Sequence, residues 1–295
     1  MRAVFLGTAP FAVPSLEALV AAGHDVALVV TQPDRPGNRL KLTPPAVKGA
    51  AERLRLPVLQ PERVRSAEAL EGITAAGPEV LVVAAYGQIV PRPLLDLAPA
   101  GAINVHASLL PRWRGAAPVA RAILAGDRVT GVTIMRMDEL LDHGPVLARR
   151  ETEIGPHETA VALGERLARL GSDLLVETLG SLAEIQPEPQ NEEQATQAPK
   201  LKKTDGELEW TLPADEIDRH VRALEPWPGV TLPFGGRRVK VHSGRAAGGT
   251  GSPGDILAVG RDGVEVACGR GSYVLVTIQA PGSRPVPARV LAAGF

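Results

Sequence analysis

The sequence predicts an α/β protein, in which a Rossmann-like parallel-sheet domain is followed by a linker and a smaller OB-like β-barrel domain. Strand-length apolar runs alternate with helical patterns in the first half. A polar, proline-bearing segment comes next, and short strands separated by Gly-rich turns fill the last part. We expect domain boundaries at residues 1–184, 185–203 and 204–295.

The first half carries five apolar runs of strand length. They are Arg2–Gly7, Val26–Thr31, Val80–Tyr86, Ala102–His106 and Gly131–Met137. The helical patterns between them are Val13–Ala22, Ala46–Leu54, Ala67–Ala75 and Ala116–Ala125. Strand–helix–strand repetition implies a parallel sheet covered on both faces, and near-continuous apolar strands fit such burial.

The second half changes character after a long amphipathic helix around His157–Leu182. The segment Ile185–Lys200 is polar and proline-bearing, so it resembles a linker that few contacts should cross. A helical stretch at Ala214–Leu224 precedes the strand patterns RRVKVHS, DILAVG, GVEVACG and SYVLVTIQ. Their Gly-rich turns favour a small β-barrel.

Composition narrows the class of protein. The chain has 295 residues, a net charge of −1 and one cysteine, Cys268, which excludes an internal disulfide and an all-cysteine metal site. The N-terminal apolar run is too short for a signal peptide, and no stretch approaches a membrane span. The histidines lack zinc spacing. We therefore expect a cytoplasmic protein, without membrane contact or bound metal, that acts as a monomer.

Two segments are basic despite the near-zero net charge. Residues 31–65 carry eight Lys or Arg against three acidic residues, and residues 237–289 also carry eight against three. Each segment is thus net +5. Taken alone, this pattern is typical of solvated faces in an Arg-rich protein.

Asn104 and His106 are the first candidates for chemistry. They lie two residues apart in a predicted strand, so both side chains project from the same face. They also lie at the carboxyl end of that strand, where ligands of open α/β sheets bind. A capping Asn and a structural His are the alternative, but a polar pair at this edge favours a functional site.

Asp142 follows the next predicted strand, so we expect it at the same edge of the sheet. A carboxylate beside an imidazole orients the ring and favours its charged form. No Ser or Cys nucleophile accompanies these three residues, which favours direct transfer between two bound substrates. The sequence has no P-loop, and the turn after the first strand lacks the glycine spacing of a dinucleotide site.

The motif Asn104-x-His106-x-Ser108-Leu-Leu-Pro111, with Asp142-x-Gly144, resembles the formyltransferases that use 10-formyltetrahydrofolate. Five further segments narrow the resemblance to methionyl-tRNA formyltransferases, and it covers essentially the whole chain. These segments are TQPDRP, PRWRGAAP, TGVTIMRMD, LKKTDGELEW and EPWPG. One departure is local: the family usually has Gly-Leu-Asp-Thr-Gly where this chain has Leu140, Leu141, Asp142, His143 and Gly144.

The resemblance implies transfer of a formyl group from 10-formyltetrahydrofolate, a substrate, to the α-amine of methionine on initiator methionyl-tRNA. It implies that Asn104 and His106 donate hydrogen bonds to the developing oxyanion, while Asp142 orients His106 and helps to relay a proton. The implied folate-site residues are Ser108, Leu109, Leu110, Pro111, Tyr86, Gly87, Gln88 and Ile89. The implied tRNA-binding residues of the first basic segment are Arg35, Arg39 and Lys41, and the carboxyl-terminal domain is expected to hold tRNA phosphates.

Three other functions fit the sequence less well. The same chemistry with a small acceptor, such as glycinamide ribonucleotide or an amino sugar, is disfavoured by the carboxyl-terminal domain. A nucleic-acid-binding module with an inert α/β scaffold is disfavoured by Asn104, His106 and Asp142. A nicotinamide dehydrogenase is disfavoured by the missing glycine fingerprint.

Overall fold

The computed structural model describes residues 1–36 and 42–292 of the 295-residue chain. These residues form two compact units, and neither unit is continuous along the chain. The first unit consists of Met1–Pro118, Val129–Glu153 and Gly164–Ala198. The second consists of Val119–Arg128, Ile154–Leu163 and Pro199–Phe295.

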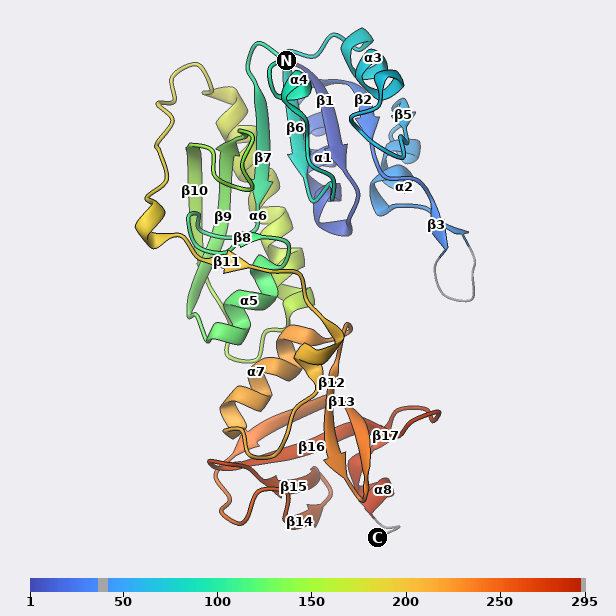
Figure 1. The fold of residues 1–295 in the computed structure, drawn as a ribbon, viewed down its shortest axis with the longest axis vertical. Helices are drawn as coiled ribbons and strands as arrows, with labels where there is room; N and C mark the ends of the chain where they lie inside the picture. Colours follow the sequence, from blue (N-terminus) through green and yellow to red (C-terminus); the bar gives the residue numbers. More distant parts are fainter. Residues whose placement is uncertain (37–41, 293–295) are drawn as a thin grey trace. The chain divides into compact units, whose positions relative to one another are not determined.

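The first unit is built on a seven-stranded sheet with the order β10-β9-β7-β6-β1-β2-β5 (Figure 1). Its strands are β1 Arg2–Gly7, β2 Asp25–Val30, β5 Val58–Leu59, β6 Val80–Ala84, β7 Ala102–His106, β9 Val129–Arg136 and β10 Val146–Glu153. The neighbours from β7 through β6, β1 and β2 to β5 pair in parallel, which confirms the Rossmann-like parallel sheet.

The β9–β10 edge of the sheet differs from the prediction. Strand β9, predicted as Gly131–Met137 within the parallel pattern, pairs antiparallel with β7, and β10 pairs antiparallel with β9. The sequence of β10, VLARRETE, lies outside the predicted strands because only its first two residues are buried, and exposed residues alternate with half-buried ones after them. An edge strand with one face in water carries little of the apolar signal.

The helices that accompany these strands lie close to the predicted ranges, except for one four-residue helix that the sequence did not predict. They are α1 Val13–Ala21, which follows the 3-10 helix η1 Pro10–Ala12, then α2 Ala46–Arg53, α3 Ala67–Ala75, α4 Arg92–Leu95 and α6 Ala160–Gly180. Helix α3 begins where Ser66 caps it, with the Ser66 hydroxyl accepting a hydrogen bond from the Ala69 amide. A short two-stranded ribbon, β3 Arg35–Pro36 with β4 Leu42–Thr43, follows β2.

One face of the sheet carries an apolar cluster that also contains helix residues. Side chains of alternate strand residues, among them Val4, Leu6, Leu81 and Val83, join one apolar cluster with Ile73 of α3 and Leu94 of α4. Ala102 of β7 belongs to the same cluster. Because strand side chains alternate, Asn104 and His106 continue the Ala102 face toward the carboxyl end of β7.

Helix α6 packs on the opposite face of β7 and β9, and Gly171 permits its close approach. A Cβ atom built at Gly171 would lie 2.9 Å from Val105 Cγ1 and 3.1 Å from Val132 Cγ1. The side chains that bear the polar chemistry and those that contact α6 thus leave β7 on opposite sides. The packed helix fixes the position of the strand that carries Asn104 and His106.

The segment 185–198, whose composition resembles that of a linker, belongs to the first unit and is bonded to it. Strand β11, Gln197–Ala198, pairs in parallel with β8, Arg114–Gly115. Between these ends, the Val146 and Glu188 backbones exchange hydrogen bonds, and the Trp113 amide donates to Thr196 Oγ1 at 2.8 Å. The sequence did not predict these contacts, because they join backbone and polar groups of residues that lie far apart in the chain.

The second unit contains an antiparallel sheet with the order β12-β13-β16-β15-β14, and β17 also pairs with β16. Its strands are β12 Val230–Phe234, β13 Arg237–Ala247, β14 Ile256–Gly260, β15 Gly263–Ala267, β16 Ser272–Gln279 and β17 Val286–Pro287. Its helices are α5 Pro118–Ala125, α7 Ala214–Leu224 and α8 Ala288–Ala292. In the part of the chain that the structure describes, β12 and β14 stand at the two ends of the strand order, so closure into an OB-like barrel stays a prediction.

Helix α7 organises the second unit. Ile217, Val221 and Leu224 are buried at helical spacing, and the helix packs against β13. On its polar side, Arg219 Nε donates to the Leu124 carbonyl at 3.3 Å and Arg222 donates to the Glu158 carbonyl at 3.0 Å. These bonds attach the two short chain excursions, Val119–Arg128 and Ile154–Leu163, to the second unit.

The close approach of α6 can be tested with two glycines of the same helix. Gly171→Ala should lower the free energy of unfolding by about 1–3 kcal/mol, because the added methyl overpacks Val105 and Val132. Gly164→Ala is the matched control: its Cβ would meet nothing within 4 Å, and we expect a gain of up to about 1 kcal/mol from helix propensity. Urea denaturation measures both, and equal gains in the two variants would contradict this packing.

Candidate active site

The candidate site begins at the carboxyl end of β7. Asn104 is 8% exposed and His106 is 6% exposed, in a strand whose other residues are buried and apolar. Polar groups are costly to bury unless they find hydrogen-bonding partners, so their presence here indicates a function or a network. His106 shows such a network.

Both ring nitrogens of His106 face acceptors. Nε2 lies 2.9 Å from the Trp113 carbonyl, and Nδ1 lies 3.7 Å from Asp142 Oδ2. Trp113 adopts a left-handed backbone conformation with φ of 61°, which places its carbonyl in the loop after β7 beside the ring. A carbonyl on one side and a carboxylate on the other are the partners that suit a ring able to donate from both nitrogens.

Asp142 reaches His106 by a route that the sequence did not predict. Strand β9 runs antiparallel to β7, with Ile103 opposite Arg136, so β9 ends away from His106. The loop between β9 and β10 carries Asp142 back, and its Oδ2 accepts a hydrogen bond of 2.8 Å from the Gly115 amide. The expectation that His106 and Asp142 lie together is confirmed, but the reason given, a shared parallel edge, is wrong.

A cluster that the sequence did not reveal surrounds the Asp142 turn. Arg114 is only 5% exposed, and its guanidinium donates to Gln190 Oε1 and to both carboxylate oxygens of Glu192. Gln190 Nε2 donates to the Asp142 carbonyl at 2.9 Å and to the Gly144 carbonyl at 2.8 Å. The hydrogen bonds from Arg114, followed by its charge, hold the pKa of Glu192 below its usual value.

His143, which with Leu140 departs from the family motif, has two acidic neighbours. Its Nδ1 lies 2.6 Å from Asp138 Oδ2 and its Nε2 lies 3.5 Å from Glu192 Oε1. Asp138 also accepts a hydrogen bond from the Leu140 amide at 2.9 Å. His143 therefore joins the start of the turn to the same carboxylate that pairs with Arg114.

Ser108 uses its polar groups to hold the following turn. Its hydroxyl donates to the Arg112 carbonyl at 2.6 Å, and its carbonyl accepts from Thr133 Oγ1 at 2.7 Å. The Leu110 amide donates to the same Thr133 oxygen at 3.0 Å, and the Leu110–Pro111 peptide is cis. The predicted folate residues 108–111 thus form a fixed turn beside His106.

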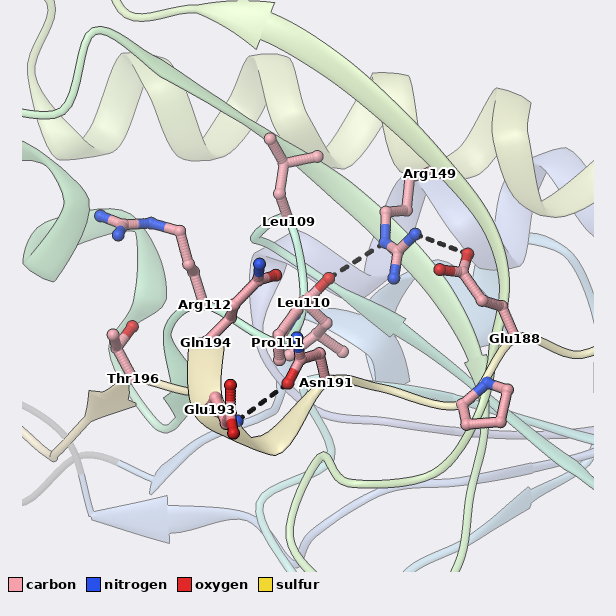
Figure 2. Close-up of a pocket in the computed structure, with 11 residues that line it drawn as sticks. Leu109, Leu110, Pro111, Arg112, Arg149, Glu188, Asn191, Glu193, Gln194 and Thr196 are labelled. Atoms are coloured by element: carbon pink, nitrogen blue, oxygen red, sulfur yellow. Dashed lines mark hydrogen bonds and ion pairs between the residues drawn. The ribbon is translucent and has the colours of Figure 1, made fainter.

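A cavity of about 590 Å³ borders this turn, and Figure 2 shows the side chains that line it. Its lining residues are Leu109, Leu110, Pro111, Arg112, Arg149, Glu188, Pro189, Asn191, Glu193, Gln194 and Thr196. Figure 2 shows Arg149 between the Leu110 carbonyl, at 3.0 Å, and the Glu188 carboxylate, at 2.8 Å. Asn104, His106 and Asp142 are outside this lining, so the cavity lies beside the polar cluster.

The end of β6 supplies the other predicted folate segment. The Tyr86 side chain belongs to the apolar core, where burial raises its pKa to about 12, while its carbonyl accepts from Thr8 and Gln32. Gly87 has φ of 85°, and a Cβ there would lie 2.5 Å from Gln32 Nε2. Gln88 Oε1 accepts from the Val64 amide at 2.9 Å, whereas Ile89 is 84% exposed. Only part of this segment is therefore open to a ligand.

Of the predicted tRNA-binding residues, Arg35 lies in β3 and is exposed, 3.7 Å from Glu62. Arg39 and Lys41 lie outside the described residues. The preceding residue, Asp34, accepts hydrogen bonds from Gln60 and Lys48, which lower the pKa of its carboxyl group.

The described residues, 1–36 and 42–292, hold neither a metal-binding group nor a membrane span of the helical kind. Among them, no three His, Cys, Asp or Glu side chains come together in a group that would hold a metal ion. No helix in this range is long and apolar enough to cross a membrane.

Comparison with known proteins accounts for both units. The family model described as formyl transferase matches residues 1–179, and the one described as formyl transferase, C-terminal domain, matches residues 200–295. Among solved structures, HypX from Aquifex aeolicus in complex with tetrahydrofolic acid shares the fold at 18% identity and a TM-score of 0.66, over 100% of this chain and 47% of that one. An N-formyltransferase from Helicobacter canadensis shares it at 14% identity and a TM-score of 0.68, over 97% and 100%.

Curated relatives are much closer in sequence. The methionyl-tRNA formyltransferase of Citrifermentans bemidjiense is 47% identical over 100% of this chain and 94% of that protein. That of Solibacter usitatus is 49% identical over 100% and 96%, and that of Halorhodospira halophila is 51% identical over 96% and 93%. The chain belongs to the methionyl-tRNA formyltransferases of the formyl transferase family.

Proposed function

We propose that the chain formylates the α-amine of methionine on initiator methionyl-tRNA, with Asn104, His106 and Asp142 as its catalytic residues. The donor is 10-formyltetrahydrofolate. The observation that carries the assignment of residues is the buried His106 ring between the Asp142 carboxylate and the Trp113 carbonyl, two residues from Asn104. The neutral amine attacks the formyl carbon, the new C–N bond replaces the bond to folate N10, and the proton of the amine leaves to N10.

Asn104 and His106 would stabilise the tetrahedral intermediate. A formyl oxygen that gains charge needs donors already aimed at it, in a site that excludes water. The Asn104 amide offers two N–H groups and His106 offers Nε2–H, which the Trp113 carbonyl accepts in this structure. We propose that the oxyanion replaces the Trp113 carbonyl as the acceptor during the reaction.

Asp142 would act through the other side of the ring. Its carboxylate orients the ring through Nδ1, which keeps Nε2 directed at the oxyanion. Nε2 donates there in the ring form that carries a hydrogen on both nitrogens. The second task of the carboxylate is to accept the amine proton, through water, on the way to folate N10. The Gly115 amide leaves the carboxylate with lone pairs free for both contacts.

The pterin site is proposed between the end of β6 and the Asp142 turn, with Ser108–Pro111 as its floor. At the strand end, Thr8 and Gln32 donate to the Tyr86 carbonyl and thereby fix the backbone before Gly87. Exposed apolar side chains flank it on both sides: Ile89 is 84% exposed, and Leu140 and Leu141 are 62% and 67% exposed. A flat heterocycle requires main-chain donors and acceptors within such an apolar slot.

The tRNA is proposed to contact two basic regions. One is the loop with Arg35, Arg39 and Lys41, and the other is the second unit, whose residues 237–289 are net +5. Phosphate contacts supply affinity and position without reading sequence. Closure of the second unit's antiparallel sheet into an OB-like barrel, a common nucleic-acid-binding fold, is part of this proposal. Aminoacylated tRNA is a cytoplasmic substrate, so we place the reaction in the cytoplasm, carried out by a monomer.

The catalytic assignment can be tested with three alanine variants. Asn104→Ala, His106→Ala and Asp142→Ala should each lower the turnover number by about 10²–10³-fold, the usual loss for a removed transition-state donor. Single-turnover formylation of methionyl-tRNA measures the loss, and circular dichroism checks the fold. The control is Asp173→Asn, at an exposed site on α6, which should leave turnover unchanged. Near-normal turnover in two of the three variants would refute the assignment.

The tRNA proposal predicts a different kinetic signature. The double variant Arg39→Ala/Lys41→Ala should weaken tRNA binding and leave folate affinity unchanged, because it removes phosphate partners only. The slope of log affinity against log salt should become shallower by about 1 for each phosphate that the protein no longer neutralises. Arg53→Ala/Arg55→Ala removes the same charge from α2 and the residues after it, and serves as the control. Equal weakening of tRNA binding in both double variants would show that Arg39 and Lys41 contribute only through the net charge of the protein.

A further inference from the structure

The side-chain amide of Gln190 uses all of its hydrogen-bonding capacity on Arg114 and on the turn that carries Asp142. Its two amide hydrogens are directed at the carbonyls of Asp142 and Gly144, at 2.9 Å and 2.8 Å. Its carbonyl oxygen accepts from Nε and Nη2 of Arg114, at 3.0 Å and 2.8 Å. A glutamine amide has two donors and two acceptor lone pairs, so none is left over.

Only one orientation of this amide fits its surroundings. A flipped amide would place its NH2 group against the Arg114 guanidinium, which only donates, and its oxygen against two carbonyls, which only accept. Gln190 is therefore bound to the turn with a fixed direction. The contact also spans 48 residues of sequence, from the middle of the segment 185–198 to the loop between β9 and β10.

The turn held in this way has an uncommon backbone conformation and several restraints. Asp142 has φ of 50°, in the left-handed region that few residues other than Gly adopt and that Asp tolerates better than most. Its carboxylate is fixed by the Gly115 amide at 2.8 Å, and Gly115 follows Arg114 directly. Arg114, nearly buried, is in turn paired with both oxygens of Glu192. One cluster thus restrains the backbone and the side chain of the same aspartate.

We propose that Gln190, fixed by Arg114 and Glu192, is a positioning residue for the formyl transfer, and that it acts by setting the Asp142 carboxylate relative to His106. The proposal rests on the catalytic role of Asp142 given under the proposed function. The carboxylate lies 3.7 Å from His106 Nδ1, a separation that a small shift of the turn would alter. Displacements of about 1 Å at reacting groups cost up to about a hundredfold in rate.

The proposal also assigns a role to the segment whose composition is typical of a linker. Residues 188–198 are attached to the first unit at both ends, by the bonds between Glu188 and Val146 and by the pairing of β11 with β8. Gln190 and Glu192 lie between these anchors. The segment thereby restrains the turn that carries Asp142.

A double-mutant cycle in the full-length chain tests whether Gln190 acts through Asp142. Gln190→Met keeps the length of the side chain and removes every hydrogen bond, so the single-turnover rate at saturating folate and tRNA should fall by about ten- to a hundredfold. In the Asp142→Ala background, the same change should alter the rate by less than about threefold, because the group being positioned is gone. Gln186→Met, at an exposed glutamine of the same segment, is the matched control and should have the wild-type rate.

Gln190→Glu provides a second variant, in case Gln190→Met does not fold. It retains an acceptor for Arg114 but places oxygen against the two carbonyls, so the rate should fall as with Met. A purely structural role predicts equal reductions in rate with and without Asp142, and that result would overturn the proposal. A wild-type rate in the Gln190 variants, together with a reduced rate in Asp142→Ala, would also overturn the proposal. An unimpaired Asp142→Ala would instead refute the proposed catalytic role itself.

Discussion

The contact between the Asp142 carboxylate and the His106 ring is the constraint on which the rest of the site depends. His106 ends strand β7, whereas Asp142 lies in the loop between β9 and β10 and has a left-handed backbone conformation. A loop of nine residues between β9 and β10 would not hold such a geometry by itself. The surrounding structure therefore has to supply rigidity from both sides of the contact.

The rigidity on the His106 side comes from packing, and that on the Asp142 side comes from polar bonds. Strand β7 is buried throughout, and its opposite face contacts α6 closely at Gly171. The turn, by contrast, is held by charged and amide groups centred on the buried Arg114. A buried guanidinium is costly unless it is paired, so the cluster has little freedom to rearrange once it is formed. Apolar packing could not replace these bonds, because the groups to be restrained are two backbone carbonyls and a carboxylate.

The features that sequence reasoning predicted are those encoded by short-range periodicity. The alternation in Ala102–His106 predicts that Asn104 and His106 share a face, and the helical patterns predict α3 and α7 at their observed bounds. Strand direction has no such local signal, which explains the unpredicted antiparallel β9. The bond from Gln190 to the Asp142 turn spans 48 residues, so no local pattern could reveal it. Tyr86 shows a third limit: a motif places the residue near the site, but the direction of its side chain into the core depends on three-dimensional packing.

The proposed function places the choice of acceptor outside the catalytic cluster. Every residue assigned to formyl transfer, and every member of the Arg114 cluster, lies in the first unit. Folds of this kind also occur in an N-formyltransferase crystallised with an amino sugar nucleotide, at 14% identity. A fold shared between proteins with such different ligands does not itself select an acceptor. Under the proposed function, specificity for a tRNA depends on surfaces that bind its phosphates. In this chain, the candidates for those surfaces are the basic loop after β2 and the basic residues of the second unit, because charge is concentrated in those two stretches.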